Sequence, residues 1–357
     1  MKKIALLGLG KVGTLIGFLL HEQFIVTTYD NSDSHYPVKL PFPVVAADLS
    51  KADEVQKVLK QADAVVSALP FHLNKTIATI AHQKGIHYFD LTEDVNTTHY
   101  IESLAESASA VLAPQCGLAP GLIGIIGGHL AKKFDSLRDI ELRVGALPRY
   151  PNGQLSYSFT WSPTGVLNEY INDAEAIHNG KRKTVPSLEG FEQLNIEGQE
   201  YEAFTTSGGL GTMCKTFEGK VDTLNYKTIR YPGHGKLMRF LLYELILKNE
   251  LPELERILTH AKPPVDDDLV HVYAVVEGEI KGKMKREEFF ETYFPLKLFG
   301  HTWRAISWTT AASLAAVVEL VAQGKLPQKG FIKQEKIQLE DFYNTQSGSL
   351  LKPQKNL

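Results

Sequence analysis

The stretch KIALLGLGKVGTLIGFLLH, residues 3–21, decides the fold class. It opens with an apolar run typical of a buried strand, continues through closely spaced glycines, and ends in an apolar helical pattern. Gly8 allows a tight turn, Gly10 admits a pyrophosphate, and Gly13 lets the helix pack on the strand. Lys11 and Val12 fill the turn, where the amides of a helix N-terminus favour negative charge. The stretch therefore predicts a dinucleotide-binding turn.

An acidic residue supports this interpretation. Asp30 follows the next apolar run, residues 24–29, where a carboxylate can accept hydrogen bonds from the hydroxyls of an adenosine ribose. It would repel the 2′-phosphate of NADP, and the first arginine of the chain is Arg138, so NAD is the predicted cofactor. Some nearby side chains leave NADP open as the alternative: Lys11, Asn31, Ser32 and Lys39.

Strand-like and helical runs alternate as far as residue 113, which predicts a parallel sheet covered on both faces. Ser50 is the expected N-cap of a helix over residues 51–61. The residues that follow two of the strands are assigned to the cofactor site: Asp48, Ala68, Leu69 and Pro70. The alternative for the last three is an ordinary strand end, with Pro70 starting the next helix.

Further candidates lie at the same predicted sheet edge. Asp90 and Glu93 could act as proton acceptors, although Thr92, Glu93 or Asp94 could instead cap the following helix. Cys116 precedes a helix, where a thiol can become nucleophilic. No histidine neighbours it in sequence, and hydride transfer needs no covalent sulfur intermediate, so we expect a glycine-rich turn between two lobes.

The chain after residue 121 changes character, and the pattern predicts an antiparallel sheet with helices. Residues 140–147 and 155–161 are expected strands, and residues 269–276 and 280–289 a hairpin around Glu277-Gly278. The expected helices cover residues 235–248, 253–260 and 309–323. The predicted domains are a Rossmann domain over 1–121 and 301–345, a mixed α/β substrate and dimerisation domain over 122–300, and a frayed tail over 346–357.

Candidate substrate residues lie in this second domain. Arg230 could bind a carboxylate through two hydrogen bonds, and His234 could titrate near neutrality as a base. The alternatives are a surface ion pair for Arg230 and a helix cap for His234. Trp161 and Ser162 are further substrate candidates, and the histidines show no metal-ligand spacing, so no metal site is predicted.

Composition limits the partners. Lys and Arg total 38 against 41 Asp and Glu, so the chain lacks the positive charge that would favour nucleic acid or an anionic membrane. The 2 cysteines fit a reducing compartment, and no export signal precedes the first strand. We expect a cytoplasmic homodimer that acts on a small molecule.

Several segments together resemble the saccharopine dehydrogenase family. They are GLGKVG (8–13), CGLAPG (116–121), YSFTWSP (157–163), RYPGH (230–234) and GFIKQEKIQLEDF (330–342). The resemblance extends over nearly the whole chain and is strongest to its short members, the L-lysine 6-dehydrogenase type. It implies an N-terminal Rossmann lobe, an inserted mixed α/β lobe and a C-terminal return to the first.

The resemblance also implies an activity. Family members oxidise a carbon–nitrogen bond of an amino acid with a nicotinamide cofactor, so saccharopine or lysine is the expected substrate. It places Arg230 at the substrate carboxylate, and Gly8 to Gly13 with Asp30 at the cofactor. Glutamate-forming members carry an acid where this chain has Ala119, which favours free lysine. The alternatives are a carboxyamine dehydrogenase that makes a polyamine precursor, and a non-catalytic nucleotide sensor.

Overall fold

The computed structural model describes residues 1–31 and 39–353. Ser32 and residues 354–357 of the predicted tail lie outside this part of the chain. The chain divides into two compact units. Unit 1 comprises Met1–Ile125, Lys297–Thr302 and Ser307–Leu357, and unit 2 comprises Ile126–Leu296 and Trp303–Ile306.

A 7-stranded parallel sheet forms the centre of unit 1, in the order β17-β6-β5-β4-β1-β2-β3. Its strands are β1 (Lys3–Leu7), β2 (Ile25–Asp30), β3 (Val44–Ala46), β4 (Ala64–Ser67), β5 (His87–Asp90), β6 (Val111–Ala113) and β17 (Gly330–Phe331). Without β17, the order read from the other edge is β3-β2-β1-β4-β5-β6, which is that of a dinucleotide-binding doubly wound sheet. The predicted parallel sheet is confirmed, because every strand pair in it is parallel.

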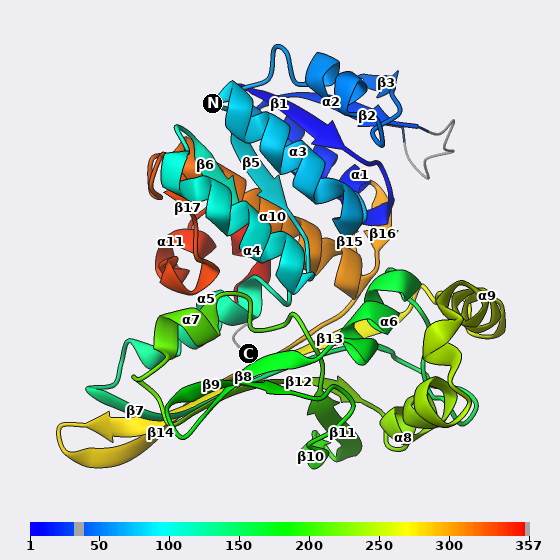
Figure 1. Cartoon of the computed structure of the whole chain (residues 1–357), viewed down its shortest axis with the longest axis vertical. Coiled ribbons are helices and arrows are strands. Elements are labelled where there is room, and N and C mark those ends of the chain that lie inside the picture. Colours follow the sequence, from blue (N-terminus) through cyan, green and yellow to red (C-terminus); the bar gives the residue numbers. More distant parts are fainter. Residues whose placement is uncertain (32–38, 354–357) are drawn as a thin grey trace. The chain divides into compact units, whose positions relative to one another are not determined.

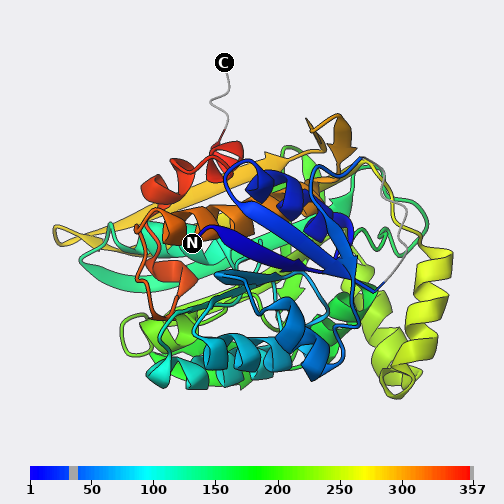
Figure 2. The same ribbon diagram turned by 90° about the horizontal axis from the view of Figure 1, so that it is seen from above.

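Helices cover both faces of this sheet (Figures 1 and 2). On one face lie α3 (Phe71–Lys84) and α4 (Val95–Leu104), and on the other α1 (Lys11–His21) and α10 (Ala305–Ala322). The remaining helices of the unit are α2 (Ala52–Val58), α11 (Leu339–Tyr343), the first part of α5 (Leu122–Ala131) and short 3-10 turns. Helix α10 is long and apolar enough to cross a membrane, but 89% of it is buried in the fold, as in a core helix.

Two local predictions for unit 1 are wrong. Ser50 does not cap α2, because its hydroxyl donates to Asp48 Oδ1 at 2.6 Å, and the helix begins after Lys51 without a side-chain cap. The segment after Thr345 is not frayed as far as it is described. Its 3-10 helix Gly348–Leu351 buries Leu351.

Unit 2 contains an 8-stranded mixed sheet, which confirms the predicted fold class. Its strands are β7 (Ser136–Pro148), β8 (Ala174–His178), β9 (Lys181–Val185), β10 (Glu192–Ile196), β11 (Gln199–Thr205), β12 (Thr223–Arg230), β13 (Asp268–Ile280) and β14 (Lys283–Tyr293). The pairs are antiparallel except for β7 with β12, which run parallel. A further short pair, β15 (Leu296–Leu298) with β16 (His301–Trp303), lies mostly in unit 1.

The β13–β14 hairpin exists, but its turn lies at Lys281-Gly282 and not at Glu277-Gly278. Gly278 lies inside β13, where the register to β7 shifts. A Cβ at Gly278 would come within 2.1 Å of the Ser136 carbonyl oxygen. This glycine therefore serves a close backbone approach within the sheet, and not a turn.

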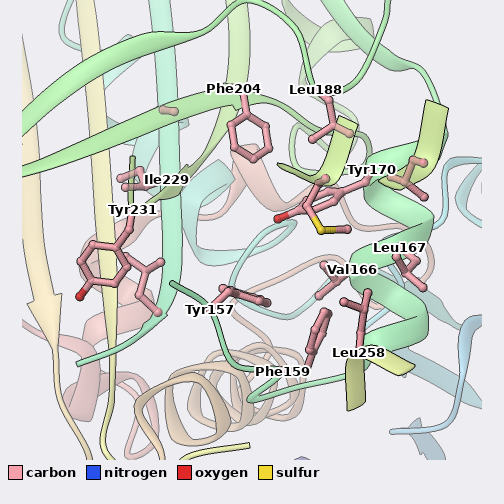
Figure 3. Packing of buried hydrophobic residues seen from close by; sticks show 14 of the residues in the cluster. Tyr157, Phe159, Val166, Leu167, Tyr170, Leu188, Phe204, Ile229, Tyr231 and Leu258 are labelled. Carbon is pink, nitrogen blue, oxygen red and sulfur yellow. The ribbon is translucent and has the colours of Figure 1, made fainter. Parts of the chain in front are cut away.

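The segment over residues 155–161 is not a strand as expected. Its amides bond locally or to one distant carbonyl, as when Phe159 N donates to Lys262 O, so it joins no strand ladder. Its aromatic side chains enter a buried cluster with Tyr170 and Phe204 (Figure 3). Helices α6 (Pro163–Ile171), α8 (His234–Arg239) and α9 (Leu251–Ala261) contribute residues to this cluster, and the unit also contains α7 (Met213–Phe217). Helix α8 is shorter than predicted and continues as π and 3-10 turns.

Candidate cofactor and substrate sites

The glycine turn of unit 1 joins the end of β1 to the start of α1. Gly8 has a φ of +90°, which suits glycine, and a Cβ there would lie 3.0 Å from the Ala68 carbonyl oxygen. A Cβ at Gly13 would lie 2.0 Å from the Gly8 carbonyl oxygen, so only glycine allows this approach of helix to turn. A Cβ at Gly10 would meet nothing within 4 Å. The open space beside Gly10 is where the motif admits a pyrophosphate.

Asp30, the last residue of β2, lies beside this turn. Its Oδ2 accepts a hydrogen bond of 2.6 Å from the Leu9 amide, so the carboxylate is held at the glycine turn. Lys11 and Val12 form the first turn of α1, whose leading amides have no acceptor within the helix. These residues fit the diphosphate and ribose of a dinucleotide, because backbone donors, a glycine cradle and an acidic side chain lie together.

The other predicted cofactor residues divide into two groups. Ala68 and Leu69 lie against Gly8 and so line the glycine turn, whereas Pro70 is the N-cap residue of α3, as the alternative interpretation expects. Asp48 instead bonds to Ser50 and pairs with Lys51 at 2.9 Å, contacts that hold the pKa of Asp48 at about 2. Its contacts favour a role at the start of α2.

Asp90 is fully buried at the end of β5. Its carboxylate accepts from the Tyr88 hydroxyl at 2.6 Å and from the Thr92 and Gln115 amides at 3.0 and 2.9 Å. Burial raises the pKa of Asp90 to about 6 despite these bonds. The carboxylate therefore ties the loops after β5 and β6 together, which argues against a role as catalytic base.

Glu93 lies three residues further along the same edge and is only half-buried. Burial, together with the negative charges of Asp94 and Asp90, raises the pKa of Glu93 to about 7. Asp94 caps α4 by accepting from the Thr97 amide at 2.6 Å, so Glu93 is not needed as the cap. Among the acidic candidates, Glu93 best suits proton transfer near neutral pH.

Cys116 is buried, and its thiol donates to the Ala113 carbonyl at 3.1 Å and accepts from Gln334 Nε2 at 3.3 Å. Burial raises its pKa far above the usual range. A nucleophile needs the thiolate, so this arrangement supports the predicted glycine-rich turn and not covalent catalysis.

In unit 2, Arg230 ends β12 with 2% of its surface exposed. Its Nε donates to the Tyr170 hydroxyl at 2.8 Å, and its Nη1 donates to the Ile229 carbonyl at 2.8 Å. Its guanidinium lies 4.7 Å from the centre of the Tyr157 ring. Within the described residues Arg230 forms no ion pair, so the alternative of a surface ion pair is wrong, and the negative charge of the buried Glu169 acts on the guanidinium from beyond ion-pair distance. A buried cation in this state can take an anionic ligand.

His234 lies beside Arg230 and begins α8. Its Nδ1 lies 3.0 Å from the Leu155 carbonyl and its Nε2 3.0 Å from the Tyr170 hydroxyl. Burial and the charge of Arg230 lower the pKa of His234 to about 3. Both ring nitrogens already have partners, which argues against the predicted catalytic base.

The two other predicted substrate residues have structural contacts. Ser162 is the N-cap of α6, where its Oγ accepts from the Gly165 amide at 3.1 Å, and Trp161 packs on the aromatic cluster. Sequence reasoning assigned no role to Tyr157 and Tyr170, the aromatic partners of Arg230. Tyr157 stands in the segment that carries the resemblance, but no local pattern distinguishes Tyr170 from a core tyrosine.

Family models match both parts of the chain. Residues 4–116 match the saccharopine dehydrogenase NADP binding domain, and residues 117–352 match the saccharopine dehydrogenase C-terminal domain. The name of the first domain indicates NADP, whereas Asp30 predicts NAD.

Curated relatives are longer and distant. The mitochondrial alpha-aminoadipic semialdehyde synthase of Rattus norvegicus is 25% identical over 276 residues, which cover 71% of this chain and 29% of that protein. The NADP+, L-glutamate-forming saccharopine dehydrogenase of Saccharomyces cerevisiae is 24% identical over 237 residues, which cover 59% of this chain and 49% of that protein.

Solved structures show the same fold. The apo L-Glu-forming saccharopine dehydrogenase of Saccharomyces cerevisiae superposes with a TM-score of 0.73 at 16% identity, over 96% of this chain and 97% of that one. A homospermidine synthase from Legionella pneumophila in complex with NAD gives 0.66 at 14% identity, over 98% and 89%.

Proposed function

The chain belongs to the saccharopine dehydrogenase family, and from this premise we propose that it is a nicotinamide-dependent oxidoreductase acting on a carbon–nitrogen bond of an amino acid. One observation carries the choice of an amino acid. Arg230 is a buried cation without an ion pair in the described chain, a state that favours a substrate carboxylate. The glycine cradle of unit 1 supports the dinucleotide.

NAD is the proposed cofactor. The Asp30 carboxylate is held at the glycine turn by the Leu9 amide, where it would repel a 2′-phosphate and accept from ribose hydroxyls. When bound, the nicotinamide supplies the hydride acceptor. The protein supplies the backbone donors of the turn and of the α1 N-terminus, which bind and orient the diphosphate.

Glu93 is the proposed proton acceptor. A substrate amine must be neutral before its carbon can lose a hydride, so a base must first remove a proton from the ammonium group. Glu93 has a pKa of about 7 and can hold that proton near neutral pH. Arg230 is the proposed ligand of a substrate carboxylate, an interaction that would orient the substrate.

L-Lysine and saccharopine are the candidate substrates. The resemblance to the family implies an acid in glutamate-forming members where this chain has Ala119, and this difference favours lysine. A carboxyamine dehydrogenase is the alternative, because the fold is shared with a homospermidine synthase. A protein that binds NAD without turnover would instead be a nucleotide sensor.

A substrate panel tests the proposal. L-Lysine, saccharopine and carboxyamines are each supplied with NAD or NADP, and reduced nicotinamide is read by absorbance. We expect amino-acid-dependent reduction of NAD. Arg230→Gln should lower kcat/KM by about 100-fold, because the substrate carboxylate would lose the buried cation that binds it.

The exposed Arg256, which pairs with Glu253 on α9, provides the matched control. Arg256→Gln should leave kcat/KM unchanged, and both variants should bind NAD like the wild type. Turnover of the amino acid that is unaffected by Arg230→Gln would contradict the assignment of Arg230.

A further inference from the structure

Arg230 is one end of a continuous chain of hydrogen bonds inside unit 2. Its Nε lies 2.8 Å from the Tyr170 hydroxyl, which lies 3.0 Å from His234 Nε2. His234 Nδ1 lies 3.0 Å from the Leu155 carbonyl oxygen. All three side chains are buried.

The donor and the acceptor of each of these hydrogen bonds follow from the chemistry of the groups involved. A carbonyl only accepts, so His234 Nδ1 carries the proton and the other nitrogen of the neutral ring, Nε2, accepts. The Tyr170 hydroxyl must then donate to His234, which leaves its oxygen to accept from the Arg230 guanidinium, a group that only donates. The order Arg230 to Tyr170 to His234 to Leu155 is the one arrangement that satisfies all four groups.

The remaining contacts restrict the guanidinium further. Nη1 donates to the Ile229 carbonyl, and the guanidinium carbon lies 4.7 Å from the centre of the Tyr157 ring and 5.8 Å from that of Tyr170. Figure 3 shows the two tyrosines within the aromatic cluster that surrounds them. The Nε and Nη1 thus have hydrogen-bond partners, and the Tyr157 ring lies close to the guanidinium. Within the described residues, Nη2 has no hydrogen-bond partner.

We propose that Tyr170 and His234 are positioning residues that hold the Arg230 guanidinium in one orientation, with its terminal edge presented to a substrate carboxylate. The inference rests on the proposed function, in which Arg230 binds that carboxylate. It adds a determinant of specificity, because an oriented buried cation favours a carboxylate-bearing substrate over its decarboxylated analogue. It also gives His234 a role as a neutral acceptor.

Tyr170→Phe removes the hydroxyl and keeps the ring. Its hydrogen bond to a charged group should be worth about a factor of 10, so KM for L-lysine should rise about 10-fold with little change in kcat. Turnover of cadaverine, which lacks the carboxylate, should not change. The preference for L-lysine over cadaverine should therefore fall by the same factor.

Tyr231→Phe is the matched control. Tyr231 belongs to the same buried cluster, and its hydroxyl donates to the Pro148 carbonyl, outside the chain of bonds. Both variants lose one buried hydroxyl, but only Tyr170→Phe should change the preference for L-lysine. An equal loss with both substrates, or an equal effect of the two variants, would overturn the inference.

Two substitutions of His234 test the acceptor role. His234→Gln keeps an oxygen able to accept from Tyr170, whereas His234→Leu keeps none. The leucine variant should reproduce the loss of preference seen in Tyr170→Phe, and the glutamine variant should restore most of it. Failure of glutamine to improve on leucine would count against a hydrogen-bonding role.

A measurement without turnover separates this inference from the proposed function. In wild-type protein labelled with ¹⁵N-histidine, the His234 signal is identified as the one that disappears in His234→Gln. That signal should show a neutral ring, with its proton on Nδ1, throughout pH 5–8. A ring that becomes protonated in this range overturns the inference whatever the kinetics.

If no amino acid is oxidised, the proposed function fails. Calorimetric binding of L-lysine then replaces turnover, and absent binding, or equal binding by wild type and Tyr170→Phe, overturns the inference as well.

Discussion

The two candidate sites are built from different materials. The glycine turn of unit 1 is made largely of backbone, where the absence of side chains at Gly8 and Gly13 allows the approach of turn, strand and helix. The Arg230 site of unit 2 is built from side chains. Its three hydrogen-bonded pairs join residues that lie 60, 64 and 79 positions apart in the sequence. A backbone site is specified by local spacing, whereas a side-chain site depends on the completed fold.

The largest effect should come from adding one carbon to the backbone site. In Gly13→Ala the new Cβ would lie 2.0 Å from the Gly8 carbonyl oxygen, so turn and helix must separate. We expect no measurable binding of NAD by calorimetry and a loss of about 1–3 kcal/mol of stability from overpacking.

Gly10→Ala is the control that separates binding from folding. Its Cβ meets nothing within 4 Å in the protein, so the melting temperature should stay near that of the wild type. NAD affinity should still fall, because the methyl group would occupy the space for the pyrophosphate. A Gly10→Ala protein that binds NAD normally would contradict our placement of the diphosphate.

Local spacing explains how much could be predicted from the sequence. The glycine turn and Asp30 follow from residues 3–30 alone, and the doubly wound sheet follows from alternating strands and helices. The prediction of a turn at Gly278 is wrong because the need for glycine there comes from the Ser136 carbonyl of a neighbouring strand, which is distant in sequence. Tyr170 was missed for the same reason, since its partner Arg230 lies on another element.

Glu93 tests whether unit 1 also depends on a side chain. Glu93→Gln removes the proposed base and should lower kcat by about 100-fold without changing NAD binding. In the wild type, kcat should rise as the pH increases through about 7, because the deprotonated carboxylate is the active form. The exposed Glu106 provides the control, as Glu106→Gln should keep both rate and pH profile. A wild-type rate that is flat across this range would contradict the role of Glu93.

Asp268 shows that unit 2 also uses a carboxylate to bind backbone. It accepts from the Ala305 and Ile306 amides at the start of α10, at 2.6 and 3.0 Å, and burial raises its pKa from 3.8 to about 6. A raised carboxyl pKa favours folding at low pH, and this contribution is lost as pH rises through about 6. Between pH 4 and 7, the free energy of unfolding should fall by about 2 kcal/mol through this group.

The measurement is a difference between variants. Asp268→Asn cannot titrate, so its melting temperature should change less between pH 4.5 and 7.5 than that of the wild type. Asp267→Asn alters the exposed neighbour, which pairs with Arg149, and should keep the wild-type pH dependence. Identical pH dependence in all three proteins would show that Asp268 has no shifted titration.

The smallest effect should come from Asp30, the acidic side chain held at the backbone site. Asp30→Asn keeps an oxygen for the Leu9 amide but loses the charge that binds ribose hydroxyls and repels a 2′-phosphate. NAD affinity should fall about 10-fold and NADP affinity should fall less, which narrows their ratio. Asp53→Asn on the surface of α2 should leave that ratio unchanged. Equal losses for both dinucleotides would mean that Asp30 positions the turn through Leu9 and does not select the cofactor.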